Sequence, residues 1–185
     1  MSESHSSIST RQRVADTLRI GGTIAFWVQI VLVATSAVIL LFAFADPGFN
    51  ISMNSLFRLV PTIGALAALG YGAYWSWGYI GLARRLRRQE AHTYPSRAEV
   101  AQILERGVTI NLVGLVLTLI ASQTIVSALL FKALTLPAGI AVARPGLLIN
   151  SLDIFVVQAC LFLIIAGVVG IVIAFWLLKL LHSEQ

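Results

Sequence analysis

Residues 146–178 read GLLINSLDIFVVQACLFLIIAGVVGIVIAFWLL, and Asp153 is the only charged residue among them. An α-helix rises about 1.5 Å per residue, so about 20 apolar residues cross the roughly 30 Å hydrocarbon core of a bilayer. This stretch is longer than that minimum. It therefore predicts a transmembrane helix.

Three further apolar stretches, at residues 20–45, 59–83 and 108–131, lack charged side chains and are also long enough to span a bilayer. Apolar residues make up 58% of the chain and charged residues 11%, which leaves a soluble domain too little polar surface. We predict an all-α membrane protein with four transmembrane helices in residues 20–178. A polar tail at residues 1–19, a connector at 84–107 and a C-terminal tail at 179–185 complete it, and the Ser-rich composition of residues 1–10 predicts disorder there.

The distribution of basic residues predicts the orientation. If the four spans alternate in direction, one side carries Arg11, Arg13, Arg19, Arg84, Arg85, Arg87, Arg88, Arg97, Arg106 and Lys179, and the other carries Arg58, Lys132 and Arg144. The positive-inside rule then places both termini and the connector in the cytoplasm or in an organelle's stroma. This topology explains the net charge of +5 without nucleic acid as a partner. A cleaved signal peptide is the alternative for the first stretch, but a signal core has only about 7–15 apolar residues.

The connector has two recognisable features. Aromatic residues followed by Arg84, Arg85, Arg87 and Arg88 are typical of an anchor that binds anionic lipid headgroups, and a docking patch for a partner is the alternative. Residues 95–99 read PSRAE, a capping box that predicts the start of a helix. If that helix continues to Phe131, a bend is expected near Gly107.

Polar side chains inside the spans are expected to have interhelical roles, because hydrocarbon makes them costly. Asp153 and Lys132 are expected to form an ion pair at the outer boundary, and a gate or ion relay at Asp153 is the alternative. Gln123 and Gln158 lie at matching depths and are expected to hydrogen-bond to each other. Gln29 lies nearer the membrane centre, so a glutamine-lined polar path is a second interpretation. Asn111 is expected near the inner surface, satisfied by water or a cap.

Small residues form a stripe in each of two spans, with a strict four-residue spacing in the second. They are Gly64, Ala68, Gly72 and Ser76 in the second span, and Ala159, Ala166, Gly170 and Ala174 in the fourth. Because lipid gives little hydrophobic drive for helix association, such stripes allow the close backbone contact that holds helices together. We expect them to pack within one bundle; a homo-oligomer or another membrane subunit is the alternative partner.

The sequence contains no recognisable enzyme motif, so we expect no catalytic residues and no cofactor. His5, His92 and His182 lie outside the predicted spans, and Cys160 is the only cysteine. The remaining polar groups within the spans are a poor set for a transition metal, which prefers several imidazole, thiolate or carboxylate ligands. We therefore predict no preformed metal site.

Several short blocks together resemble a known family. They are WSWGYI at residues 75–80, RRLRR at 84–88, PSRAEV at 95–100, NLVG at 111–114, QT at 123–124, KALT at 132–135 and LDIFVVQA at 152–159. In this order they are similar to the chloroplast inner-envelope translocon-component and iron-permease family, which has cyanobacterial relatives. The likeness covers about residues 25–178. It departs from the family after Gln158, where relatives carry polar residues and a histidine and this chain is almost wholly apolar.

The resemblance implies a four-span protein of a plastid inner envelope or of a cyanobacterial inner or thylakoid membrane. The short polar segment before the first span favours a cyanobacterial-type member. The implied function is transport-associated, either iron permeation or protein translocation. The alternative is a structural or assembly subunit packed against a larger membrane complex, such as a photosynthetic one. The expected partners are membrane lipids and either other membrane subunits or further copies of the chain.

Overall fold

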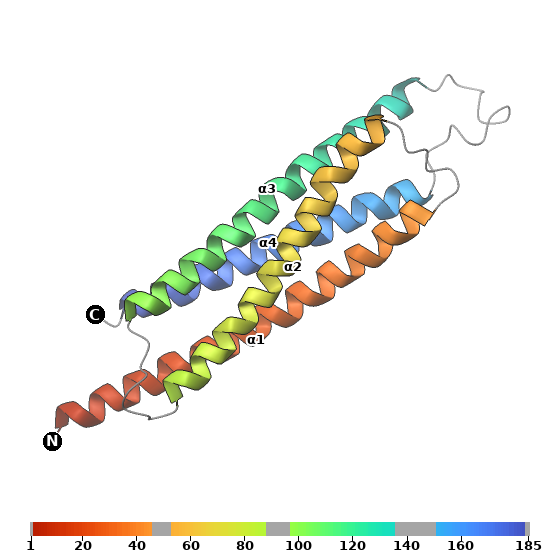
Figure 1. Cartoon of the computed structure of the whole chain (residues 1–185). Helices are drawn as coiled ribbons and strands as arrows, with labels where there is room; N and C mark the ends of the chain where they lie inside the picture. Colours follow the sequence, from red (N-terminus) through yellow and green to blue (C-terminus); the bar gives the residue numbers. More distant parts are fainter. Residues whose placement is uncertain (1, 46–52, 88–96, 136–150, 184–185) are drawn as a thin grey trace.

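A computed structural model describes residues 2–45, 53–87, 97–135 and 151–183. These residues form four long α-helices (Figure 1): α1 at Ser2–Ala45, α2 at Met53–Arg87, α3 at Arg97–Thr135 and α4 at Ser151–Ser183. Each is at least 33 residues long and so spans about 50 Å or more, which exceeds the thickness of a hydrocarbon core. The prediction of an all-α protein with four long helices is confirmed.

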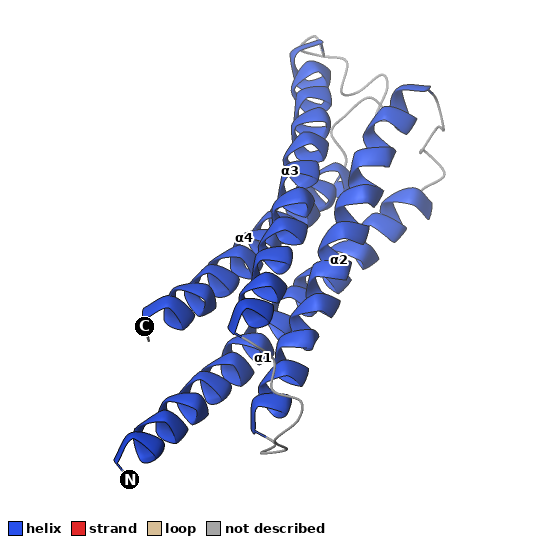
Figure 2. Cartoon of the chain, turned by 60° about the vertical axis from the view of Figure 1, so that its left-hand side comes forward, coloured by secondary structure: helices blue, strands red, loops and turns tan. Residues whose placement is uncertain are grey.

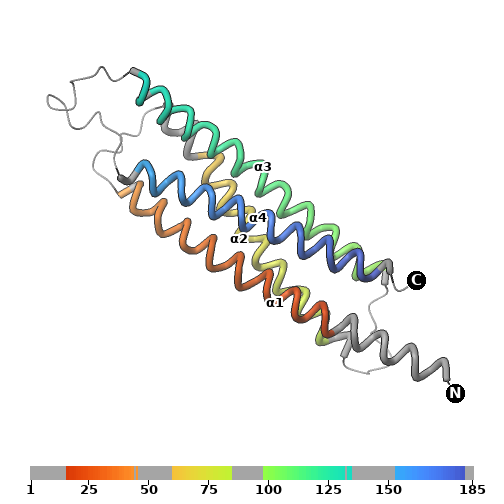
Figure 3. Tube along the Cα trace, turned by 180° about the vertical axis from the view of Figure 1, so that it is seen from behind, coloured from red at the N-terminus to blue at the C-terminus, as the bar shows by residue number. Residues whose placement is uncertain are grey.

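The four helices form one up-and-down bundle. Close packing joins α1 to α2, α2 to α3, α3 to α4 and α4 to α1, and α2 also approaches α4 across the centre. Seen from behind, α4 lies between α1 and α3 (Figure 3), and the turned view shows that all described elements are helical (Figure 2). The start of α1 and the end of α4 lie at the same end of the bundle, which we call the terminal end (Figure 1).

The bundle is held together along regular seams. On α3 the buried positions are Val100, Leu104, Gly107, Asn111, Gly114, Thr118 and Ala121. Their alternating spacing of four and three residues is the pattern of helices that pack as in a left-handed coiled coil. The other three helices present comparable seams, so the core is a stack of layers to which every helix contributes.

Size, rather than polarity, separates the inside of the bundle from its outside. Many fully buried positions are alanines or glycines, whereas large apolar side chains such as Leu41, Phe131 and Ile154 are at least 65% exposed. Such an apolar exterior suits lipid, in which close contact between small residues stabilises helix pairs. Three helices are long and apolar enough to cross a membrane, over Asp16–Ala43, Ala98–Phe131 and Asp153–Leu181. The less apolar α2 is rich in Gly, Tyr and Trp.

Two helix boundaries bear on the sequence predictions. Helix α3 begins at Arg97 and includes Glu99 in its first turn, as the capping box predicted; Ser96 lies outside the described residues. The disorder predicted for residues 1–10 is wrong for Ser2 onward, because α1 already starts there. A helix nucleated in the apolar span extends at little further cost, which explains the longer α1.

Candidate functional site

A layer of buried polar side chains crosses the middle of the bundle. It consists of Gln29 on α1, Ser76 on α2 and Asn111 on α3, and each of the three side chains is at most 1% exposed. The backbone carbonyl of Ala166 brings α4 into the same layer. We call these four groups the polar layer. Its hydrogen bonds connect all four helices.

Gln29 is the centre of the polar layer. Its Nε2 donates to Asn111 Oδ1 at 2.6 Å and to the Ala166 carbonyl at 3.2 Å. Its Oε1 accepts a hydrogen bond from the Ser76 hydroxyl at 3.0 Å. Both amide protons and the carbonyl oxygen of Gln29 are therefore in use. One side chain on α1 thus binds each of the other three helices.

The other two side chains are anchored to their own helices. Asn111 Nδ2 donates to the Gly107 carbonyl at 2.9 Å, one turn earlier on α3. Ser76 Oγ lies 3.1 Å from the Gly72 carbonyl, its second acceptor, one turn earlier on α2. The Asn111 bond fixes its side chain, so that Oδ1 is free to accept from Gln29, whereas the single Ser76 proton is shared between the Gly72 carbonyl and Gln29. The preorganisation of Asn111 limits the side-chain entropy that is lost when the interhelical bonds form.

Two glycines make room for the polar layer. A Cβ at Gly72 would lie 2.8 Å from Asn111 Oδ1, and a Cβ at Gly170 would overlap both the Gln29 amide nitrogen and Asn111 Oδ1. Real Cβ atoms do not approach polar atoms so closely, so neither position has space for a larger residue. The small residues that form the two predicted stripes therefore border the buried amides directly.

The remaining stripe residues lie along contacts within the bundle. Gly64 faces Leu117 of α3, and Ala68 lies near Gly114 of α3. The carbonyl of Ala159 accepts a hydrogen bond from Ser36 of α1 at 3.0 Å. Ala166 and Ala174 are fully buried. The structure thus places both stripes inside one copy of the bundle.

A second contact joins α2 and α3 nearer the terminal end. The Tyr79 ring is 1% exposed and its hydroxyl lies directly over Gly107, where a Cβ would collide with it. On the same side of α2, the Trp75 indole N–H donates to the Ile103 carbonyl at 3.1 Å. Gly107, where the sequence predicts a bend, therefore has a packing role and lies within a continuous α3.

Two polar contacts predicted from the sequence differ in the structure. Gln123 and Gln158 do lie at the same depth, because Leu115 packs on Gly167 and the two helices run antiparallel from there. Both side chains are exposed, however, and within the described residues neither amide forms a hydrogen bond. The predicted hydrogen bond between Gln123 and Gln158 is wrong, because each side chain points to the outside of the bundle and not towards the other helix. Asn111, expected near water, is instead buried against Gln29.

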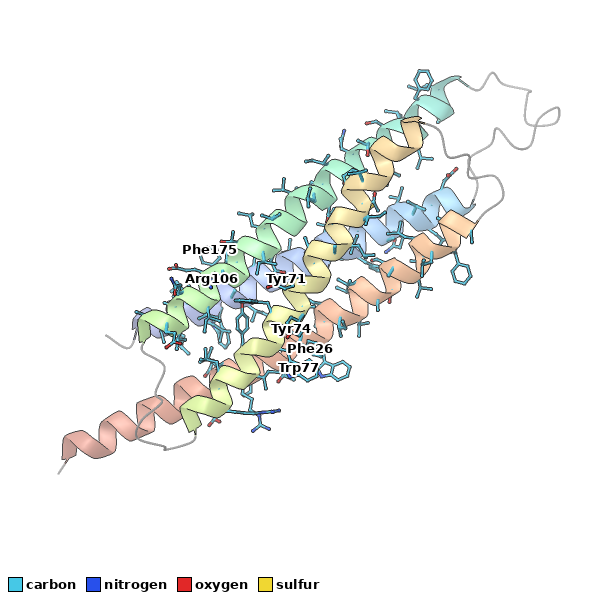
Figure 4. The ribbon with its side chains drawn as sticks, viewed as in Figure 1. Phe26, Tyr71, Tyr74, Trp77, Arg106 and Phe175 are labelled. Carbon is cyan, nitrogen blue, oxygen red and sulfur yellow. The ribbon has the colours of Figure 1, made fainter. Side chains whose placement is uncertain are left out.

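The charged residues lie at the two ends of the helices. Asp153 is half-buried at the start of α4, while the side chain of Lys132, its predicted partner, lies outside the described residues. Arg84 is exposed; the side chains of Arg85 and Arg87, and the whole of Arg88, fall outside the description. Arg106 projects from α3 near the terminal end (Figure 4).

An aromatic contact joins α1 to α2. Phe26 packs edge-on against Trp77, with ring centroids 4.9 Å apart (Figure 4).

The chemistry of the polar layer is that of neutral amides and one hydroxyl. Among the described residues, no group of three or more His, Cys, Asp or Glu side chains is placed to hold a metal ion. The sequence pointed to Gln29 as an interhelical residue, but Ser76 and Asn111 were not predicted as its partners. The sequence did contain a signal for this pairing: Gln29, Ser76 and Asn111 all lie on the terminal side of the middle of their apolar stretches.

Comparison with known proteins assigns the family. The family described as "Protein of unknown function (DUF3611)" has a sequence model that matches residues 9–182. Protein TIC 21, chloroplastic, of Arabidopsis thaliana is 33% identical over 165 residues, which cover 85% of this chain and 54% of the relative. The chain thus spans about half the length of the curated relative it matches. No solved structure matches the chain significantly. The sequence resemblance to the translocon-component family is confirmed, and the chain belongs to the DUF3611 family.

Proposed function

We propose that this chain is an integral membrane subunit of a protein-transport assembly, in which it acts as a packed four-helix scaffold and not as a lone permease. The observation that carries the proposal is the closed polar layer. Gln29 occupies the centre of the bundle with every hydrogen-bonding group of its amide engaged, and the groups around it are at most 1% exposed.

A permeating solute would need a polar path through this layer. Opening one would break three hydrogen bonds of Gln29 and separate α1 from its neighbours. The layer offers only neutral groups, which would replace the hydration shell of a divalent cation poorly compared with carboxylates or imidazoles. The arrangement supports a structural role more than the iron-permease role that the family resemblance also implies. It requires no catalytic step.

The topology that we propose has four crossings, with both termini on the cytoplasmic or stromal side. Helix α2 is the fourth crossing: it runs between α1 and α3 and shares the polar layer with them. Exposed Arg19, Arg84, Arg106 and Lys179 all lie towards the terminal end, where the positive-inside rule places cytoplasmic charge. The membrane that we propose is a plastid inner envelope or its cyanobacterial counterpart.

Two experiments test the proposal. The full chain is first reconstituted in liposomes that contain a dye quenched by ferrous iron, and iron entry is compared with that of protein-free liposomes. We expect equal rates; faster entry with protein would overturn the scaffold assignment. A photo-crosslinking residue at Tyr74, whose side chain is 69% exposed, is then introduced in native membranes. Adducts with translocation subunits or transported chains support the role, whereas adducts confined to a photosynthetic complex would favour the assembly alternative.

The topology is tested by single cysteines in a Cys160→Ala background. Arg84→Cys at the terminal end and Leu134→Cys near the end of α3 are labelled with a membrane-impermeant maleimide from each side of sealed vesicles. We expect the two positions to be labelled from opposite sides. Labelling of both from one side would mean that α3 does not cross the membrane.

A further inference from the structure

Two exposed arginines occupy matching positions on α1 and α2. Arg19 precedes Phe26 by seven residues on α1. Arg84 follows Trp77 by seven residues on α2. Seven residues make about two turns, so each arginine lies on the same side of its helix as that ring, about 10 Å closer to the terminal end. Because the two rings are in contact (Figure 4), Arg19 and Arg84 lie at the same depth along one junction of α1 with α2. We call them the arginine pair.

The two helices are still packed together at the level of the arginine pair. Leu18 and Ala83, the residues that precede the two arginines, are each at most 2% exposed and belong to one buried apolar cluster. The next residue along a helix is turned by about 100°, so each arginine leaves this contact towards the outside. Because α1 and α2 run in opposite directions, these equal steps turn both side chains towards the same outer side of the junction, where the aromatic rings also lie.

The arginine pair marks the edge of the hydrocarbon region. Arg19 directly precedes the charge-free residues 20–45, and Arg84 directly follows the charge-free residues 59–83. Guanidinium groups at this level reach the lipid headgroups, whereas rings two turns further in lie beside the glycerol groups and the upper acyl chains. The Trp77 ring is 54% exposed and so can contact a bound molecule. From outside to inside, the order on this face is therefore cation, then aromatic ring.

Helix α2 leaves space between its ring and its guanidinium group. Gly81 lies four residues after Trp77 and three before Arg84, which places it on the same face of the helix. A Cβ at Gly81 would meet nothing within 4 Å. A ligand can therefore approach the backbone of α2 between the ring and the arginine. We call Phe26, Trp77, Gly81 and the arginine pair the α1–α2 outer face.

An anionic phospholipid has the same order of groups as this face. Its phosphate lies at headgroup level and its acyl chains lie further in. Guanidinium groups bind phosphate oxygens with pairs of charge-assisted hydrogen bonds, and two arginines that converge from neighbouring helices can hold one phosphate from both sides. An acidic peptide would match the arginines but not the rings, which lie within the hydrocarbon. Charge and depth together therefore select a lipid.

We propose that the α1–α2 outer face binds one anionic phospholipid, with its phosphate between Arg19 and Arg84 and its upper acyl chains against Phe26 and Trp77. This is a defined site shared by two helices, and it adds α1 to the basic connector that the sequence indicates as a lipid anchor. The proposal depends on membrane insertion but not on the closed polar layer. A scaffold and a transporter could both bind a lipid here, so this inference and the proposed function can fail separately.

The other exposed basic residues described at the terminal end do not form such a pair. Arg106 is five residues from buried Asn111 on α3, and Lys179 is nine residues from buried Gly170 on α4. These separations turn the two side chains about 140° and 180° away from the buried positions, so each points away from the bundle. Exposed Glu105 also adds a negative charge next to Arg106. Arg106 and Lys179 therefore supply a matched control.

The test counts the lipids that stay bound to the full chain. Native mass spectrometry is performed on the chain in detergent with dioleoyl phosphatidylglycerol or, separately, dioleoyl phosphatidylcholine. We expect the parent to retain one phosphatidylglycerol in preference to phosphatidylcholine. Arg19→Gln and Arg84→Gln should each raise the dissociation constant for phosphatidylglycerol about fivefold, and the double variant about thirtyfold, the effect expected for basic side chains at an anionic membrane surface.

Two controls separate this site from general charge attraction. The double variant Arg106→Gln/Lys179→Gln removes the same charge from the same end of the bundle and should leave the dissociation constant unchanged. Inorganic phosphate in large excess should not displace phosphatidylglycerol, because it cannot contact the rings. Equal weakening by the two double variants, equal retention of phosphatidylcholine, or displacement by inorganic phosphate would refute the proposal.

A second measurement locates the lipid on the unaltered chain and so does not depend on the folding of any variant. Phosphatidylglycerol with a photoreactive diazirine high on one acyl chain is incorporated in liposomes with the full chain, and the labelled peptides are identified after irradiation. We expect labelling around Phe26 and Trp77. Trp176, which is 52% exposed towards the same end of α4, is the internal reference. Labelling around Trp176 that equals or exceeds that around Trp77 would overturn the assignment of the site.

Discussion

Replacing Gln29 by Met removes the centre of the polar layer with little change in shape. Met is unbranched like Gln and similar in length, so it fills the same space without an amide. The substitution deletes three interhelical hydrogen bonds, to Asn111, Ser76 and the Ala166 carbonyl. Ser76 keeps the Gly72 carbonyl as an acceptor, and Asn111 keeps its own bond to Gly107. Only Asn111 Oδ1 loses its sole partner among the described residues.

The magnitude follows from measured hydrogen bonds between transmembrane helices. These average about 0.6 kcal/mol each and reach about 1.7 kcal/mol. Three bonds therefore contribute about 2 kcal/mol, with an upper limit of about 5 kcal/mol. A loss of about 2 kcal/mol raises the unfolded-to-folded ratio roughly thirtyfold. The expected result for Gln29→Met is destabilisation within this range.

The assay is equilibrium unfolding of the chain in bicelles by titration with SDS, followed by tryptophan fluorescence. Gln158→Met is the matched control, since its amide is exposed and forms no hydrogen bond among the described residues, and its free energy of unfolding should change by less than about 0.5 kcal/mol. A double-mutant cycle with Asn111→Leu should show non-additivity, because the two side chains share a bond. Equal, small changes for Gln29→Met and Gln158→Met would refute the central role of Gln29.

Three further substitutions test the close contacts. Gly170→Leu would drive a side chain into the polar layer and should reduce the yield of folded protein in detergent, whereas Gly78→Leu, whose Cβ meets nothing within 4 Å, should fold like the parent by size-exclusion chromatography. Gly107→Ala should lower the melting temperature because the new methyl group meets the Tyr79 hydroxyl, and adding Tyr79→Phe should recover part of that loss. Trp75→Phe removes the indole donor to an α3 carbonyl and should cost about 0.6–1.7 kcal/mol in the SDS titration; no loss would mean that this bond contributes nothing.

The sequence predicted the helices and the matching depth of Gln123 and Gln158. It placed Asn111 nearer the surface than Gln29, to which it is bonded, and it did not predict the direction in which the polar residues point. Length and lack of charge identify a span, and counting along a helix gives depth, which is why Gln123 and Gln158 were correctly placed at one level. Direction is usually read from hydrophobic periodicity. In this chain the lipid-facing residues are as apolar as the core, so that signal is absent.

Residue size indicated in part which helix faces point into the bundle. The four-residue spacing of Gly64, Ala68, Gly72 and Ser76 marked a face of α2 that the structure places in the bundle. The sequence did not show in the same way which polar side chains would pair between helices. Asn111 meets Gln29 only because α3 and α1 have a particular register and both lie next to Gly170, and register is a property of all four packed helices.

The two glutamines at positions 29 and 123 show how burial decides the role of one side chain. Both are amides in a membrane span, and both need partners because hydrocarbon offers none. Gln29 finds all of its partners inside the bundle, so its bonds contribute to the stability of one copy. Gln123 points outward and forms no hydrogen bond among the described residues, so its amide adds no bond within that part of the bundle. Removing the first amide should therefore lower the free energy of unfolding, whereas removing the second should change it little.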